Sequence, residues 1–322
     1  MRKMFLLSLF GAVFLCGEFQ QVIAADKIRI AVANFNVSFM TAGVADKKGY
    51  FREEGLDPEI IGMRPPVSIT ALASGDIDYT TVFGSVVRAA VRGLPVRVVA
   101  SFIDGSTHAL IARAEFKFVK DLRGKTMGVG SYGASDDIAG RMMVKHYGVD
   151  PDKQMKIVAL GPDRARFAAL KEGIVDVAVI APPMDSEGRK AGFNILARAY
   201  EIFTFPFVGL GTSTRKLSEK PDEVKRTLKA FIRANRFIRD NREESIQILT
   251  AWGRTDRNSA TAAYDAAVKV FNTDGTIPES GLRLVLEQAR SEANLTREVA
   301  VGEVADLLLL REAQKELGIK GK

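Results

Sequence analysis

The sequence predicts an α/β protein built from two similar lobes, with additional helices after the second lobe. Two observations lead to this prediction. Apolar segments that read as strands alternate with helix-like segments, a pattern that favours crossover connections and largely parallel sheets. Two blocks of sequence also recur in the same order and at nearly the same spacing, which indicates an internal repeat.

The elements of the first lobe follow one another from the amino end. Apolar, β-branched runs predict strands, and segments with helical spacing or a capping residue predict helices. The first helix should end at Gly55, a residue suited to the C′ position. In chain order we expect strand 27–34, helix 40–54, strand 57–63, helix 68–75, strand 77–84, helix 85–93 and strand 96–103.

The repeat carries this pattern into a second lobe, which we expect to open near Gly124. The block at 55–84 resembles the block at 148–183. Each block ends a helix at a glycine and places an aspartate, Asp78 or Asp176, directly before a strand. Because both features recur in register, the two lobes should share one topology.

The rest of the chain departs from the repeat. Residues 205–214 read as one more strand, and from Lys220 onward the pattern is helical. Pro221 suits the first turn of a helix, and the helix that follows has one mostly apolar face. We expect these helices to pack on a lobe rather than to carry ligand.

The first 25 residues have the layout of a secretory signal peptide. A basic start, Met1–Lys3, precedes an apolar run, Met4–Cys16, and a small-residue end, Val22–Ala25. Cleavage after Ala24 or Ala25 would leave a mature protein outside the cytoplasm, in the periplasm. Leu15 precedes the cysteine where a lipid-anchored cysteine usually follows a small residue, so we do not expect a lipoprotein.

Composition excludes several kinds of site. The single cysteine, Cys16, lies in the segment to be removed, and the chain has only two histidines, His108 and His146. We therefore expect no disulfide, no cysteine nucleophile, no metal site and no cofactor. The net charge of +7 is scattered among acidic residues without a basic stripe, so nucleic-acid binding is not expected.

The loops at the carboxyl ends of the strands are the candidate ligand site, since ligands of open α/β sheets bind there. They are rich in Phe, Tyr, Ser, Thr and Asn, which suit stacking on an organic solute and fixing its polar ends. If the lobes face each other, one cleft is lined by the loops at 34–39, 62–66, 81–85, 130–137, 161–166 and 181–184.

One of these loops has the G-x-G-x-x-G spacing of a dinucleotide-binding loop, with glycines at 128, 130 and 133. A dinucleotide site needs an acidic residue about 20 positions further on, at the end of the next strand. Asp152 has that spacing but precedes the strand, so we reject this interpretation.

The same loop opens a helix, for which Ser135 is the expected N-cap. Such a helix start can bind a carboxylate, sulfonate or phosphate, although Asp136 and Asp137 already place negative charge there. An anion could instead meet Ser131 and the loop amides, or Arg64 or Arg164. Catalysis has no support, because no Ser/His/Asp arrangement, G-x-S-x-G motif or paired-carboxylate site can be inferred. We expect His108 to be structural.

Three segments, 71–102, 121–161 and 165–183, resemble the periplasmic solute-binding proteins of ABC importers. The subgroup is that of sulfonate, taurine and nitrate receptors, together with receptors for thiamine-pyrimidine precursors. The resemblance implies a type II periplasmic-binding fold, with two βαβ lobes joined by crossings near 104–109 and 203–209. Lobe I would then comprise 26–105 and 208–322, and lobe II would comprise 106–207.

The resemblance also implies a function and a set of contacts. A monomeric receptor would capture a small organic solute, anionic or heteroaromatic, between its lobes and deliver it to a membrane permease. The alternatives are a pyrimidine-precursor-synthesising enzyme on the same fold and a ligand-sensing domain. With Arg164 added as a candidate for an anion, the expected ligand-binding residues are Asn34, Phe35, Asn36, Ser38, Arg64, Phe83, Ser85, Ser131, Tyr132, Ser135, Arg164, Pro183 and Met184.

Overall fold

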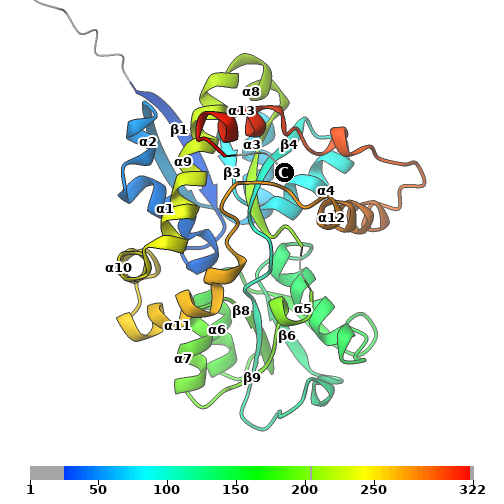
Figure 1. Ribbon diagram of the computed structural model, residues 1–322. Helices are drawn as coiled ribbons and strands as arrows, with labels where there is room; N and C mark the ends of the chain where they lie inside the picture. Colours follow the sequence, from blue (N-terminus) through cyan, green and yellow to red (C-terminus); the bar gives the residue numbers. More distant parts are fainter. Residues whose placement is uncertain (1–24, 204, 320–322) are drawn as a thin grey trace, which may run out of the picture.

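The computed structural model describes residues 25–203 and 205–319, and these residues form two lobes, one above the other in Figure 1. Each lobe contains one five-stranded sheet. The expected signal peptide lies outside the described residues, apart from Ala25. The α/β class and the two-lobed architecture are as the sequence predicts.

The two sheets have the same topology. The lobe I sheet has the order β2-β1-β3-β10-β4 and the lobe II sheet the order β7-β6-β8-β5-β9. In both sheets the fourth strand of this order is antiparallel to its neighbours. The strands of lobe I are β1 (Asp26–Val32), β2 (Leu56–Gly62), β3 (Tyr79–Thr80), β4 (Val96–Ile103) and β10 (Val208–Ser213). Those of lobe II are β5 (Ala109–Ala112), β6 (Thr126–Val129), β7 (Lys156–Ala159), β8 (Val177–Ile180) and β9 (Asn194–Arg198).

Each antiparallel strand is the one that a crossing delivers from the other lobe. The chain leaves lobe I after β4 and enters lobe II with β5, and it returns from β9 to β10. The crossings near 104–109 and 203–209 and the lobe boundaries stay predictions. The predicted lobe boundaries fall between β4 and β5 and directly before β10.

The repeated aspartates occupy equivalent positions in the two lobes. Asp78 Oδ2 accepts a hydrogen bond from the backbone N–H of Arg29 at 2.8 Å, and Asp176 Oδ2 accepts one from Thr126 at 2.9 Å. The backbone N–H of each aspartate donates in return to the carbonyl of the same strand residue. Each carboxylate thus joins two neighbouring strands of its sheet, β3 to β1 in lobe I and β8 to β6 in lobe II, which explains why the residue recurs.

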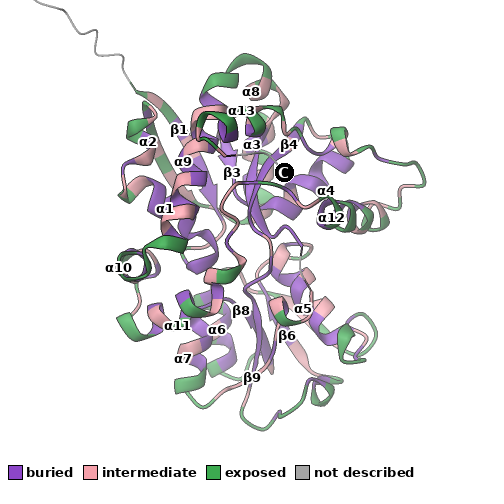
Figure 2. Cartoon of the chain, in the orientation of Figure 1, coloured by how far each residue is buried: buried purple, intermediate pink, exposed green. Residues whose placement is uncertain are grey.

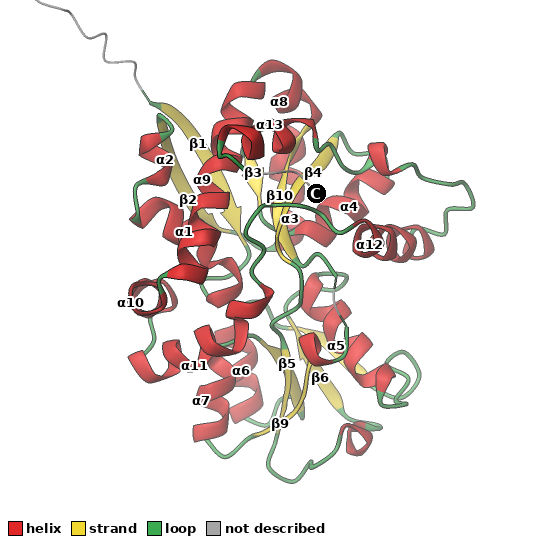
Figure 3. Ribbon diagram, in the orientation of Figure 1, coloured by secondary structure: helices red, strands yellow, loops and turns green. Residues whose placement is uncertain are grey.

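Helices cover both sheets, so the strands form the interior of each lobe (Figures 2 and 3). Gly49 has φ 77° and divides the expected first helix into two. The helices before β10 are α1 (Met40–Lys47), α2 (Tyr50–Glu53), α3 (Pro65–Ser74), α4 (Phe83–Val91), α5 (Ser135–His146), α6 (Asp163–Lys171) and α7 (Met184–Lys190).

The C-terminal region is helical, as predicted, and α9 begins at Pro221. Its helices are α8 (Thr214–Glu219), α9 (Pro221–Asp240), α10 (Arg242–Gly253), α11 (Arg257–Ala267), α12 (Glu279–Glu292) and α13 (Leu308–Glu316). Most of them pack on lobe I, but α11 lies beside α7 of lobe II (Figure 1). There Lys190 Nζ donates to Ser259 Oγ at 3.1 Å.

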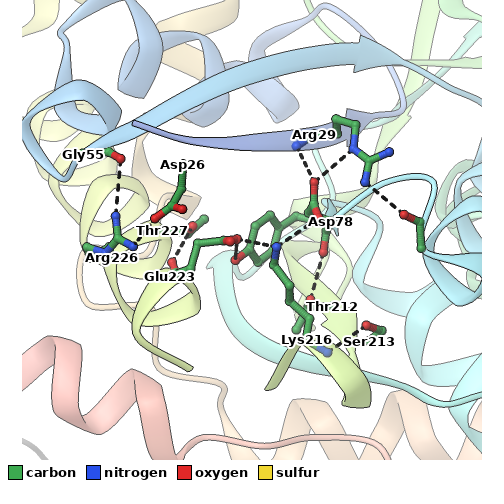
Figure 4. Close-up of polar contacts among 12 residues, drawn as sticks. Asp26, Arg29, Gly55, Asp78, Thr212, Ser213, Lys216, Glu223, Arg226 and Thr227 are labelled. Atoms are coloured by element: carbon green, nitrogen blue, oxygen red, sulfur yellow. Dashed lines mark hydrogen bonds and ion pairs between the residues drawn. The ribbon is translucent and has the colours of Figure 1, made fainter. Parts of the chain in front are cut away.

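A charged network anchors α8 and α9 to the amino ends of the lobe I strands, at the edge away from the cleft (Figure 4). Lys216 Nζ of α8 lies 3.0 Å from Asp78 Oδ1 and 2.6 Å from Glu223 Oε1 of α9. Glu223 also accepts a hydrogen bond from the Tyr79 hydroxyl at 2.9 Å. These side chains are largely buried, so each charge depends on its partner for stabilisation.

Candidate functional site

A cleft with two chambers lies between the lobes, where the carboxyl ends of the lobe I strands face those of lobe II. The outer chamber has a volume of about 600 Å³ and the inner chamber about 40 Å³. The two share Ala33, Asn34, Arg64 and Pro162, so they are parts of one cleft. The outer chamber has room for a small organic solute, and the inner chamber for a single small group.

Nine of the thirteen expected ligand-binding residues line this cleft. In the outer chamber these are Asn34, Phe35, Asn36, Arg64, Arg164, Pro183 and Met184. In the inner chamber they are Ser131 and Ser135, together with Asn34 and Arg64 again. They come from loops at the carboxyl ends of strands in both lobes, as the topology rule predicts.

The other four expected residues do not line either chamber. Ser38 is fully buried and its hydroxyl pairs with that of Thr107. Phe83 is fully buried in the core of lobe I, and Ser85 lies in the same helix, α4. The ring of Tyr132 turns outward, and its hydroxyl donates to the carbonyl of Ile157 at 3.2 Å.

An aromatic pair at the outer chamber involves a residue that the sequence did not indicate. Trp252 of α10 meets Phe35 edge to face, with ring centroids 4.7 Å apart. Its indole N–H donates to the carbonyl of Asn36 at 3.0 Å. The C-terminal helices were expected to pack on a lobe rather than to carry ligand, yet Ala251–Arg254 form part of the chamber wall. The one signal in the sequence is that Trp252, the single tryptophan of the chain, stands beside a glycine at a helix end.

The start of α5 differs from the expected capping arrangement. Ala134 occupies the N-cap position, and Ser135 is the first residue of the helix. Two aspartates of the first turn bind the preceding loop instead. The carboxylate of Asp136 accepts from the Gly130 N–H, and Asp137 Oδ2 accepts from the Gly133 N–H at 2.8 Å. These carboxylates fix the conformation of the glycine loop. The sequence indicated their negative charge at the helix start but not these hydrogen bonds.

A buried charged triad underlies the inner chamber. The Arg166 side chain is 1% exposed, and its guanidinium pairs with Asp136 and Asp163. The two carboxylates come from the first turns of α5 and α6, where they also face the helix dipoles. The triad consists of one positive and two negative charges, so the floor of the inner chamber has a net charge of −1.

His108 contributes no charge to this floor. It lines the inner chamber, and its Nδ1 lies 3.1 Å from Ser106 Oγ. Burial lowers the pKa of the His108 imidazole, because an imidazolium would lose its hydration there. Its ring packs edge-on against Phe207 with centroids 5.1 Å apart. The neutral, packed side chain agrees with the expected structural role.

Three contacts, which we call the clasp, join lobe II to lobe I and α10 across the cleft. Asn36 Nδ2 donates to Asp163 Oδ2 at 2.6 Å. The Arg164 guanidinium donates to the carbonyls of Gly253 at 2.9 Å and Arg254 at 3.0 Å. The clasp connects the two lobes in this structure. Arg164, which was expected to bind ligand, takes part in the clasp through its guanidinium.

Within residues 25–203 and 205–319, no helix has the length and apolarity needed to cross a membrane. The same residues contain no cluster of three or more histidine, cysteine or carboxylate side chains suited to a metal ion.

Known proteins with similar sequences include proteins named as binding proteins and enzymes. A Brucella abortus protein named as a binding protein is 26% identical over 245 residues, which cover 73% of this chain and 75% of the relative. A 4-amino-5-hydroxymethyl-2-methylpyrimidine phosphate synthase of Saccharomyces cerevisiae is 27% identical over 215 residues, covering 61% of this chain and 62% of the synthase.

The fold is shared with solved structures of importer components. The alkanesulfonate-binding protein SsuA from Xanthomonas axonopodis pv. citri superposes with a TM-score of 0.70 at 18% identity, covering 90% of this chain and 98% of that one. This likeness confirms the expected periplasmic-binding fold. The family model described as NMT1/THI5 like matches residues 36–245, well over half of the sequence, and the chain therefore belongs to the NMT1/THI5-like family.

Proposed function

We propose that this chain is an extracytoplasmic solute-binding receptor of an ABC-type importer. The observation that carries the proposal is a cleft between two lobes that is closed by the clasp and lined from both sides. A ligand that contacts both lobes stabilises the closed form over the open one, and a permease can recognise that difference.

The lining supports a small organic solute. The Phe35–Trp252 pair offers an aromatic wall, and Asn34 and Arg64 place polar groups beside it. Arg64 is exposed at the mouth and lines both chambers, so it is the side chain we assign to an anionic group of the solute. The receptor acts as an exported monomer, with a membrane permease as its partner and without a cofactor.

The single tryptophan provides a direct test. Mature protein comprising residues 26–322 is titrated with sulfonates, carboxylates, nitrate, pyrimidines and aromatic acids while Trp252 emission is recorded. Binding should change the emission, because the indole lies in the cleft wall, and should raise the melting temperature by mass action. In Trp252→Phe the emission signal should vanish while a smaller shift in melting temperature remains.

The relationship to the yeast synthase makes an enzyme the competing hypothesis. Incubation with each solute, followed by mass spectrometry of the products, separates the two. Tight binding without conversion supports a receptor. Conversion of a solute that leaves the melting temperature unchanged would overturn the receptor hypothesis in favour of catalysis on the same fold.

A further inference from the structure

The charges around the inner chamber determine whether an anionic group of the solute can bind there. The starts of α5 and α6 both border this chamber, and a helix start is a common anion site. Here each start already holds a carboxylate of the chain itself, Asp136 or Asp163. The nearby buried cation, Arg166, is paired with the same two carboxylates. The positions that would attract an anion are therefore occupied.

The electrostatics oppose a second anion. The triad has a net charge of −1, and its three side chains are at most 10% exposed, so solvent screens this charge weakly. Neutral His108 does not offset it. An anionic group placed in the inner chamber would lose its hydration and meet a carboxylate that has no spare cation. Arg64 borders both chambers, but it is exposed at the mouth, where solvent screens its charge more than it screens the buried carboxylates. The outer end of the cleft is therefore the place for negative charge.

Two atoms of the triad retain hydrogen-bonding capacity. Each hydrogen bond recorded for the Asp136 side chain among the described residues uses Oδ2, which leaves Oδ1 as an acceptor. Arg166 Nε is a buried donor without a partner among the described residues. A buried polar atom is costly unless a partner satisfies it. Arg166 Nε is fully enclosed, so the chamber offers Asp136 Oδ1 as an acceptor and the hydroxyls of Ser131 and Ser135 as donors. A group that both donates and accepts hydrogen bonds would complement these atoms.

We propose that the inner chamber binds a neutral, amide-like head group of the solute, such as a carboxamide, a urea or the lactam edge of a heterocycle. Its N–H donates to the Asp136 carboxylate and its carbonyl oxygen accepts from the hydroxyl of Ser131 or Ser135, both of which line this chamber. The volume of about 40 Å³ suits one such group. The apolar or aromatic body of the solute lies against Phe35 and Trp252 in the outer chamber. This inference rests on the proposed receptor function and specifies its ligand class.

The test uses isosteric solutes that differ in charge, benzamide against benzoate and nicotinamide against nicotinate. Affinities of the mature protein are measured at pH 7 by calorimetry. We expect each amide to bind at least tenfold more tightly than its carboxylate. In Asp136→Asn the net charge of the floor changes from −1 to zero. The preference for the amide over the carboxylate should then shrink about tenfold. Asp152→Asn is the control, because Asp152 is an exposed aspartate of lobe II that pairs with Arg141 and does not line the inner chamber.

Circular dichroism melting establishes that each variant is folded, and the comparison within wild type stands even if Asp136→Asn does not fold. A wild type that binds other solutes but shows no preference within either pair would overturn the inference and leave the receptor function intact. A wild type that binds no solute of either panel would contradict both. An unchanged preference in folded Asp136→Asn would remove the triad as its cause.

Discussion

Asn36 and Asp163 lie in different lobes, and the Asn36 side-chain amide donates to the Asp163 carboxylate at 2.6 Å. The backbone carbonyl of Asn36 accepts from the Trp252 indole, and Asp163 pairs with the buried Arg166. One hydrogen bond therefore connects the loop after β1, the wall from α10 and the charged floor of the inner chamber. Separating the lobes would therefore break the contact that links these three parts of the site.

The exposed half of the clasp can be removed without disturbing the core. Arg164→Ala loses the hydrogen bonds to Gly253 and Arg254, and a hydrogen bond from a charged group contributes about 1.5–3 kcal/mol at most when buried. Because Arg164 is exposed, we expect a contribution below that range, equivalent to a loss of about threefold to tenfold in solute affinity. Calorimetry measures the affinity, and small-angle scattering should show a larger radius of gyration without solute.

Arg189→Ala is the control for this clasp variant, since Arg189 is also an exposed arginine of lobe II, in α7. It should match wild type in both measurements. If Arg164→Ala also matches wild type in affinity and radius of gyration, the clasp does not contribute to closure.

Trp252 can be displaced from behind, without changing any residue that lines the cleft. A Cβ atom at Gly43 would lie 2.5 Å from a ring carbon of Trp252, closer than any real contact. Gly43→Ala should therefore shift the indole, alter its emission and weaken solute binding about tenfold, with about 1–3 kcal/mol lost from the free energy of unfolding. Gly302→Ala is the matched control, because its Cβ would meet open space. Wild-type emission and affinity in Gly43→Ala would show that the indole is not fixed by this contact.

The lobe architecture could be predicted from the sequence because its determinants are local or repeated. Asp78 and Asp176 mark the repeat, and each makes the same backbone hydrogen bond. Nine residues that line the cleft could be predicted for a similar reason. The sequence pattern shows where a strand ends, and ligands of open α/β sheets bind at the carboxyl ends of strands.

The parts of the site that were missed depend on contacts between distant segments. Nothing near Trp252 in the sequence reveals that α10 ends against Phe35, a contact that depends on how α10 packs on lobe I. The pairing of Arg166 with Asp136 joins two helices of lobe II across the chamber floor. The resemblance implied a ligand contact for Tyr132, which lies in the same loop as Ser131, yet its side chain turns outward. Periodicity identifies the loop but not the direction of each side chain within it.

Asp78 makes stability depend on pH through the network at the amino ends of the lobe I strands. Burial pushes the pKa of the Asp78 carboxyl upward, but hydrogen bonds from the Arg29 N–H and the Lys216 ammonium outweigh it, so the pKa lies below its usual value. A depressed carboxyl pKa stabilises the folded state above the unfolded pKa of about 3.9, and this contribution is lost as pH falls through the folded value.

Asp78→Asn should therefore be less stable than wild type at pH 7, by about 1–3 kcal/mol, with a difference that shrinks below about pH 4. Urea unfolding at pH 7, 5 and 3.5 measures this dependence. Asp57→Asn, an exposed aspartate in β2, should match wild type at each pH. A deficit in Asp78→Asn that stays constant from pH 7 to 3.5 would show that the charge of Asp78 is not its cause.

Substitutions at Arg64 and Tyr132 test whether the solute binds in the cleft or on the surface beside it. The sequence analysis expected both residues to bind ligand, but only Arg64 lines the chambers. Arg64→Ala should weaken the binding of an anionic solute about tenfold at low salt. The loss should be smaller at 0.5 M NaCl, because salt screens an exposed charge, and absent for a neutral solute of the same shape. Tyr132→Ala should bind both solutes as wild type does. Equal losses for the anionic and neutral solutes in Arg64→Ala would mean that Arg64 acts through packing rather than charge. A loss in Tyr132→Ala alone would place the solute outside this cleft.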